Sequence, residues 1–403
     1  MHYQDCIVFH GPEMAPMRCA SFRAEGDRIV EMDLIEPVQR IEHGAIVIIP
    51  GLVNAHTHMG DSFIPDGATG LTLEEGFFRP DGFKYREIAK LDRASHVDFI
   101  SDALSYMACS GTVAHFDFRE QGAEGATRLR EASDRTGVRS VILGQFDSVP
   151  FDLAALTRNT ADFDATAMNE LRELLEVADG FSESTMNDLT DPAWQSVRNL
   201  THAMGKARAV HCLENEGYRE LSLQRTQRGD LIQAIELYQP DLIVHLTVAN
   251  DAEIQLLADS GITAVLNPRA NANLGLPLPP VAELMDAGVN LLLGTDNGLL
   301  NSPSMLAELD FTYKLAKSQY GDALRPDPAE ILKMATSNVS KTRWGQELPG
   351  ALELGSVANF TVLDFNQTHL RRSAHLVASV LTRVTPEDVL QTVRAGKVIY
   401  QHN

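Results

Sequence analysis

The central part of the chain alternates between short apolar segments of β character and segments with helical periodicity. Apolar runs such as "GTVAHFDF", "VRSVILGQFD", "DLIVHLTV" and "VNLLLGTD" lie next to polar helical stretches such as "ATAMNELRELLEVA". Together with the opening stretch they make about eight strand–helix units, and such alternation is typical of a parallel sheet. The pattern predicts an α/β fold, with a closed (β/α)8 TIM barrel favoured. A doubly wound open sheet is the alternative, but no GxGxxG fingerprint follows the first strand.

The two ends of the chain have a different texture from the centre. "DCIVFH", "RCASFRAEGDRIVEMD" and "GAIVIIP" near the start, and "GSVANFTVLDF" and "VRAGKVIY" near the end, are short β-rich pieces separated by turn residues. Because exposed strand edges need covering, we expect both ends to pair into one small β-sandwich. The predicted division is therefore a sandwich from residues 1–48 and 346–403, with the barrel in residues 49–345.

The charge balance limits the partners of the chain. Its 403 residues include 34 Lys and Arg against 55 Asp and Glu, a formal net charge of −21. So acidic a protein repels polyanions, so neither nucleic-acid polymers nor anionic membranes are expected partners. An acidic, lysine-poor surface is compatible with adaptation to salt, and genome base composition explains it equally well.

The cysteines and the absence of long apolar runs indicate a cytoplasmic protein. No two of the 4 cysteines form a CxxC pair, no secretory-type segment opens the chain, and no apolar run approaches the roughly 20 residues of a membrane span. The sequence is compatible with a homo-oligomer as well as with a monomer.

Several apolar runs end on a histidine or an aspartate. Side chains alternate along a strand, so His56 and His58 of "PGLVNAHTH" should share one face with Asn54. A single such histidine is more often a hydrogen-bonded core residue than a ligand. The repetition is harder to obtain by chance, and the carboxyl ends of barrel strands carry the active site. We therefore expect one metal site among the residues that close these runs, which are His56, His58, His211, His245 and Asp296.

In this order and spacing, "PGLVNAHTH", "VHCLE", "VHLT" and "GTD" resemble the amidohydrolase superfamily, over nearly the whole chain. The closer resemblance is to its mononuclear aminohydrolase and chlorohydrolase branch, which includes cytosine, guanine and adenosine-type deaminases. The resemblance implies that Glu214 moves protons and that His245 contacts the attacking water or the substrate. It also implies the metal ligands: His56, His58, His211 and Asp296.

One ion is expected rather than two. Binuclear members of the superfamily bridge their metals with a carboxylated lysine at the end of the fourth strand, and the matching stretch "VADGFSESTMND" has no lysine. The nearest, Lys206, precedes the fifth strand. Three imidazoles and a carboxylate suit zinc, which we favour, with iron or manganese as alternatives.

The implied chemistry is attack of a metal-activated water on a C=N–C(NH2) unit. Asp296 would take a proton from that water, His245 would polarise the attacking oxygen, and Glu214 would protonate the ring nitrogen so that ammonia can leave. Strand parity alone does not place Glu214 on the face of His211. Glu214 reaches the site only if the strand ends or bulges between the two residues.

Loops after the strands supply the candidates for substrate contact. Arginines there can clamp a carboxylate or phosphate, although they also cap helices or pair with acids. His115 is expected in the barrel interior, as a core residue rather than a ligand. The candidates for substrate binding are Lys84, Arg119, Arg269 and Asn271.

These features favour a hydrolase that deaminates a nitrogen heterocycle of purine, pyrimidine or pterin type. Hydrolysis of a cyclic amide or a C–Cl bond at the same centre is the alternative within the enzyme class. A catalytically silent barrel that binds a partner is the alternative of another class, but such proteins usually lose metal ligands. The stretch after the HxH motif and the "NPRA" sequence depart from nucleoside deaminases, so the reaction class is predicted but the substrate is not.

Overall fold

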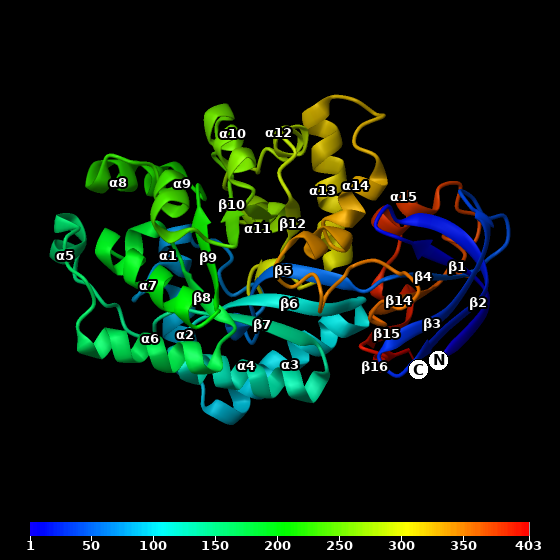
Figure 1. Ribbon diagram of the computed structural model, residues 1–403, viewed down its shortest axis with the longest axis horizontal. Helices are drawn as coiled ribbons and strands as arrows, with labels where there is room; N and C mark the ends of the chain where they lie inside the picture. The colour runs from blue at the N-terminus through cyan, green and yellow to red at the C-terminus, as the bar shows by residue number, and fades with distance from the viewer. Residues whose placement is uncertain (403) are drawn as a thin grey trace.

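The computed structural model describes residues 1–402, which form a barrel beside a separate sheet (Figure 1). Strands of the barrel sheet follow the order β12-β11-β10-β9-β8-β7-β6-β5-β13, and all their pairings are parallel. β12 and β13 are consecutive in the chain yet lie at opposite ends of this order, so together they are one interrupted eighth strand that closes the ring. The predicted (β/α)8 barrel is confirmed. Its strands are β5 (Leu52–His58), β6 (Thr112–Arg119), β7 (Arg139–Gly144), β8 (Gly180–Glu183), β9 (Ala207–Cys212), β10 (Leu242–His245), β11 (Thr263–Leu266), β12 (Leu291–Leu293) and β13 (Asp296–Asn297).

Helices cover the outside of the barrel, and their ends follow local sequence signals. Asn250 and Glu253 form a capping box at the start of α10, and Gly261 ends that helix in the left-handed conformation that glycine tolerates. Within residues 1–402, no helix is long and apolar enough to cross a membrane. The helices between barrel strands are α1 (Leu73–Phe77), α2 (Phe83–Ile88), α3 (Arg93–Cys109), α4 (Gly122–Thr136), α5 (Leu153–Arg158), α6 (Ala165–Val177), α7 (Asp191–Ala203), α8 (Glu216–Thr226), α9 (Asp230–Gln233), α10 (Asp251–Ser260), α11 (Pro268–Asn273) and α12 (Val281–Asp286), and α13 (Met305–Tyr320) and α14 (Pro328–Lys333) follow the last strand.

Both ends of the chain contribute to one seven-stranded sheet beside the barrel (Figure 1). Strands β1 (His2–His10) and β4 (Ile46–Pro50) pair in parallel, and the other neighbours are antiparallel. One core of this sheet gathers Phe22, Phe360 and Val393 from both termini. The accessory unit expected from the two ends is present, and the proposed residue limits of its parts stay a prediction. The other strands are β2 (Ala15–Glu25), β3 (Arg28–Pro37), β14 (Phe360–Asp364), β15 (Val389–Arg394) and β16 (Lys397–Gln401), with α15 (Leu376–Thr382) between β14 and β15.

An irregularity in β5 sets which side chains enter the barrel. Asn54 pairs with His115 and Thr57 pairs with Asp117, so β5 carries one residue more than β6 across this stretch. Such a bulge breaks the alternation of faces. Asn54 is therefore out of phase with His56, and its amide Nδ2 donates to Thr295 Oγ1 at 2.7 Å. The expected grouping of Asn54 with His56 and His58 was wrong for this reason.

His115 does not lie in the barrel interior, which corrects a second expectation. Its Nδ1 is 2.8 Å from Thr57 Oγ1, and its Nε2 is 2.6 Å from Ser140 Oγ. The interior cluster instead takes Phe116 and Phe118, the neighbours of His115 and Asp117 on the other face of β6. His115 is a hydrogen-bonded core histidine.

Gly294 lies at the interruption of the eighth strand, and we predict that replacing it by any residue with a side chain destabilises the protein. A Cβ at this position would lie 2.5 Å from His56 Cβ and 2.6 Å from Asn267 Oδ1. Gly294→Ala should therefore lower the free energy of unfolding by about 1–3 kcal/mol, as for overpacked cores, and displace His56. Denaturant unfolding measures the first effect and metal content the second.

Gly229→Ala is the matched control, because a Cβ there meets nothing within 4 Å in the described part of the chain. Equal stability and equal metal content of the two variants would contradict the close approach of β12–β13 to His56.

Candidate metal centre

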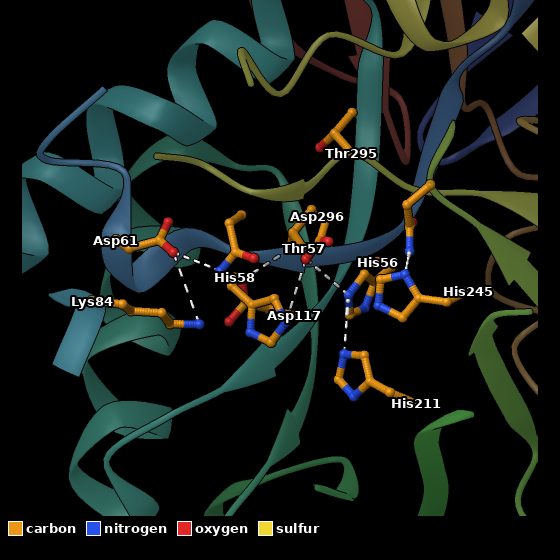
Figure 2. A network of polar contacts seen from close by, with 12 residues as sticks. His56, Thr57, His58, Asp61, Lys84, Asp117, His211, His245, Thr295 and Asp296 are labelled. Atoms are coloured by element: carbon orange, nitrogen blue, oxygen red, sulfur yellow. Dashed lines mark hydrogen bonds and ion pairs between the residues drawn. The ribbon is translucent and has the colours of Figure 1, made fainter. Parts of the chain in front are cut away.

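Five buried polar side chains meet at the carboxyl end of the barrel (Figure 2). His56 and His58 come from the end of β5, and single residues come from the ends of β9 and β10 and from the start of β13. Two overlapping groups have ligand atoms within 4.8 Å of one another, a spacing that could hold a metal ion. The first is His56, His58 and His211, and the second is His56, His245 and Asp296.

The distances between ligand atoms match those around one tetrahedral ion. His56 Nε2 lies 3.2 Å from Asp296 Oδ1 and 3.3 Å from His211 Nε2, and His58 Nε2 lies 3.6 Å from Asp296 Oδ1. Ligands about 2.1 Å from a tetrahedral zinc ion are about 3.4 Å apart. The structure thus brings the four suggested ligands to one end of the barrel, and these three pairs of ligand atoms have the separations found around one ion. His211 groups with His56 and His58, whereas Asp296 groups with His56 and His245.

Hydrogen bonds at the far ring nitrogens turn two of these imidazoles toward the centre. His211 Nδ1 lies 2.9 Å from the backbone oxygen of Glu183, and His58 Nδ1 lies 3.0 Å from Glu120 Oε1. Both partners are acceptors, so Nδ1 donates and Nε2 keeps its lone pair for a ligand. Partners of this kind fix the tautomer and the ring orientation of histidines that bind metals.

Burial keeps the histidines in the neutral form that a metal requires. It lowers the pKa of His56 to about 3 and that of His245 to about 3, and it lowers the pKa of His211 well below its ordinary value. Burial alone would raise the pKa of Asp296, but its hydrogen bond with the His56 ring outweighs burial and holds that pKa below its usual range. Neutral imidazoles beside one carboxylate are a donor set that leaves a divalent ion with positive charge.

Glu214 enters the site because the chain turns sharply after β9. The strand ends at Cys212, and Leu213 has a left-handed backbone with φ of 54°. Alternation along a regular strand would not place Glu214 on the same face as His211, but this turn brings Glu214 Oε1 within 3.7 Å of His245 Nε2. Burial, followed by the Asp296 charge, raises the pKa of Glu214 to about 8. Glu214 therefore carries a proton at neutral pH in the metal-free site.

Left-handed backbone recurs at the ends of the other strands that reach the site. His245 has φ of 80°, Leu246 59° and Asp296 63°. Residues other than glycine are uncommon in this region, and they concentrate where the surrounding structure holds functional side chains in place. Here they direct His245 and Asp296 into the centre.

The four candidates for substrate contact lie in different places. Lys84 lines the cavity over the centre. Asn271 lies behind His245, where its Nδ2 donates to His245 Nδ1 at 3.2 Å, so it orients that ring. Arg119 is buried next to Gly60 and Glu120, and Arg269 lies by Glu308 and Ser302; neither lines that cavity.

Two neighbouring cavities with shared lining residues lie by the centre. The inner one has a volume of about 40 Å³ and includes His58, His211, Glu214 and Asp296 in its wall. The outer one has a volume of about 500 Å³ and is lined largely by apolar side chains of α1 (Leu73–Phe77), α5 and α8. Both share Phe77, Ser184 and Tyr218 as lining residues. Sequence reasoning missed these three, because no motif marks a residue that reaches the site from a covering loop.

The end of the fourth barrel strand holds an acidic residue in place of a lysine. β8 ends at Glu183, which forms an ion pair with Arg79. Lys206 lies elsewhere, with its Nζ donating to the backbone oxygen of Ala178 at 2.7 Å. Nothing in this position could supply a carboxylated lysine to bridge two ions, which agrees with a single-ion centre.

Removal of one imidazole is predicted to empty the centre. His211→Ala should lower the bound zinc from about one ion per chain to a small fraction after gel filtration, because only three of the four donors remain. Elemental analysis of the zinc-supplemented protein measures this. His202→Ala, on the exposed face of α7, is the control that removes a histidine without touching the centre. Full zinc occupancy in the His211→Ala variant would contradict the assignment.

Comparison with known proteins places the chain in a family. A family model described as "Amidohydrolase family" matches residues 47–399. A protein from Methanothermobacter thermautotrophicus, named provisionally as an aminohydrolase, is 30% identical over 401 residues, 97% of each chain. A 5-methylthioadenosine/S-adenosylhomocysteine deaminase from Caldanaerobacter subterraneus subsp. tengcongensis is 25% identical over 400 residues, 94% of this chain and 87% of that one.

A solved structure shares the whole fold. The crystal structure of an adenosine deaminase from Xanthomonas campestris with bound zinc has a TM-score of 0.82 at 21% identity, and the match covers 98% of this chain and 93% of that one. The strand-end motifs, the closed barrel, the terminal sheet and the family match agree, and the chain belongs to the amidohydrolase family.

Proposed function

We propose that the chain is a metal-dependent hydrolase that deaminates an aminated nitrogen heterocycle and releases ammonia. The observation that carries this proposal is the placement of Glu214, a buried carboxyl group whose pKa is raised to about 8, beside a cluster of neutral imidazoles and the Asp296 carboxylate. One group can hold a proton while the neighbouring cluster can hold a cation. Hydrolytic removal of an amine requires both.

The proposed ligands of the ion are His56, His58, His211 and Asp296. Zinc suits this donor set, and iron or manganese are alternatives. Zinc bound to the relative from Xanthomonas campestris supports this choice. A bound divalent cation would supply a positive charge that lowers the pKa of a water molecule to about 7.

The side chains around the centre then have separate roles. Glu214 donates its proton to the ring nitrogen next to the carbon under attack, and it can later pass a proton to the departing amine. Asn271 donates to His245 Nδ1, so His245 Nε2 carries a hydrogen that orients the attacking oxygen. Asp296 accepts the proton that this oxygen loses.

Deamination is favoured over C–Cl hydrolysis by the proton on Glu214. Protonation of the ring nitrogen would assist attack in both reactions, but an amine leaves only after it is protonated, whereas chloride needs no proton, so an acid at the leaving group is required for the amine alone. Lactam hydrolysis at the same centre remains the second enzyme candidate. The deaminase names of the relatives support C–NH2 hydrolysis, and the complete set of candidate ligands argues against a silent binding barrel.

Ammonia release across a panel of aminated purines, pyrimidines and pterins tests the proposal. Glu214→Gln should lower kcat by about 10²- to 10⁴-fold, because it removes the acid, and it should leave zinc content unchanged. Glu216→Gln, an exposed neighbour, is the control. Turnover should also fall as the pH rises through a value at or below about 8, since a nearby cation lowers the pKa of Glu214 further. Activity on lactams alone, or unchanged turnover of the Glu214→Gln variant, would reject the proposal.

The outer cavity favours a substrate with a substituent on the heterocycle. One of its charged groups is already engaged, because Arg225 donates to the backbone oxygens of Leu156 and Asn187. Aromatic and aliphatic side chains form part of the wall, and Phe77 and Tyr218 line both this cavity and the inner one. A relative named for two substituted adenosines is consistent with a substrate larger than a bare base.

Leu221→Arg should therefore raise KM for substituted heterocycles by about tenfold, because it places a charge in an apolar wall, and should leave KM for the bare bases unchanged. Steady-state kinetics on matched pairs of substrates measures the difference. Leu223→Arg, on the same helix but outside the cavity lining, is the control. Equal effects on both substrate classes would show that the outer cavity does not bind substrate.

Cytoplasmic location, a small-molecule partner and homo-oligomer formation stay predictions from the sequence, which leaves open whether the acidic surface reflects adaptation to salt.

A further inference from the structure

Lys84 is a buried ammonium group that reaches the centre from outside the barrel. It belongs to α2 (Phe83–Ile88), in the long segment that covers the barrel mouth, and its side chain is 3% exposed. Its Nζ forms an ion pair with Glu120 Oε1. The same Nζ lies 3.8 Å from Asp61 Oδ2 (Figure 2). One cation therefore lies between two buried carboxylates.

Glu120 passes this contact on to a proposed metal ligand. Its Oε1 faces both Lys84 Nζ and His58 Nδ1, the latter at 3.0 Å. Within the described residues, Glu120 Oε2 has no hydrogen-bond partner, and Arg119 Nη1 lies 3.4 Å from it. The His58 contact and the Lys84 ion pair are thus the main polar constraints on this carboxylate.

Asp61 links the same cation to the strand that carries Asp296. Its Oδ2 accepts a hydrogen bond from Asn297 Nδ2 at 2.7 Å, and its Oδ1 accepts one from the backbone nitrogen of Leu299 at 3.1 Å. Asn297 directly follows Asp296 in β13. Of the two carboxylates that flank Lys84, Glu120 therefore contacts the proposed ligand His58 on the first barrel strand, and Asp61 contacts Asn297, the neighbour of the proposed ligand Asp296 on the eighth.

We propose that Lys84 and Glu120 are positioning residues of the metal centre: Lys84 holds Glu120 in place, and Glu120 holds the His58 ring with Nε2 toward the ion. This inference rests on the proposed function only in assuming that the centre holds a divalent ion. It assigns Lys84 a role other than the substrate contact expected from the sequence. The ammonium already faces two carboxylates, so little of its charge is left to bind an anionic group of a substrate.

Loss of the ammonium would leave two buried carboxylates facing one another without compensation, which is strongly unfavourable. Glu120 would then turn away or take up a proton, and His58 would lose its fixed acceptor. The expected consequence is weaker metal binding, since loss of such partners costs about 10- to 100-fold in metal affinity.

The test measures the zinc dissociation constant of the full-length protein by competition with a chelator, with zinc alone as the probe. Lys84→Met and the isosteric Glu120→Gln should each raise it by about 10- to 100-fold. The double variant should be no weaker than Lys84→Met alone, because it removes the unpaired carboxylate together with the cation. Lys90→Met, an exposed lysine just after α2, should bind zinc like the wild type. Thermal unfolding without metal shows whether each variant is folded.

Wild-type zinc affinity in folded Glu120→Gln would overturn the inference, even if Lys84→Met fails to fold. Unchanged zinc affinity with a raised KM in Lys84→Met would likewise overturn it, in favour of a substrate contact. Additive losses in the double variant would contradict the coupling of the two residues. If the wild type itself binds no zinc, the proposed function fails instead, so the two failures are distinguishable.

Discussion

Closure of the barrel through an interrupted eighth strand is the constraint on which the site depends. β12 pairs with β11, the chain steps through Gly294 and Thr295, and β13 pairs with β5. This step places Asp296 beside Thr57 in the sheet, and so beside the histidines of the first strand. Residues that are more than 200 positions apart in the sequence become neighbours because the ring closes at that point. A parallel sheet left open would keep them at opposite edges.

The second requirement is compensation of buried polar groups. A cluster of imidazoles and carboxylates in a low-dielectric interior is costly unless its members are neutral, paired or bound to a cation. His56, His211 and His245 meet this requirement as neutral rings, and Glu214 meets it by keeping its proton. Glu120 stays charged because Lys84 lies against it: burial alone would raise the pKa of Glu120, but Lys84 and His58 hold it well below its ordinary value. Neutral imidazoles can bind a metal ion, the protonated Glu214 can donate a proton, and the charged Glu120 can accept a hydrogen bond from His58.

The barrel and the proposed ligands were predictable from the sequence because both leave a local record. Each strand and each helix of the barrel is a contiguous segment with its own hydrophobic pattern, and each proposed ligand lies at the end of an apolar segment. The bulge in β5 leaves no such record, so Asn54 was assigned to the wrong face. His115 was assigned to the wrong face of β6 because every residue of that strand is buried, so burial does not mark which side faces the interior. Glu214 was expected only by resemblance, since the left-handed Leu213 that redirects it is not a glycine.

Contacts between distant segments could not be predicted from the sequence. An arginine in a loop after a strand can face the substrate or an acidic neighbour, and Arg269 lies against Glu308, 39 positions further along the chain. Arg119 is fully buried beside Gly60, where the lack of a side chain leaves room for its guanidinium. Lys84 depends on Glu120 in the same way, and the partner in each case is fixed by the fold rather than by local sequence.

The central claim is that the ends of four barrel strands converge on a single divalent ion. X-ray absorption at the zinc edge, on protein loaded with zinc and freed of excess metal, tests it most directly. The account predicts a first shell of nitrogen and oxygen atoms at about 2.0–2.1 Å, with imidazole scattering beyond it and one ion per chain. Sulfur ligands at about 2.3 Å, or a second metal at about 3.5–4 Å, would contradict it.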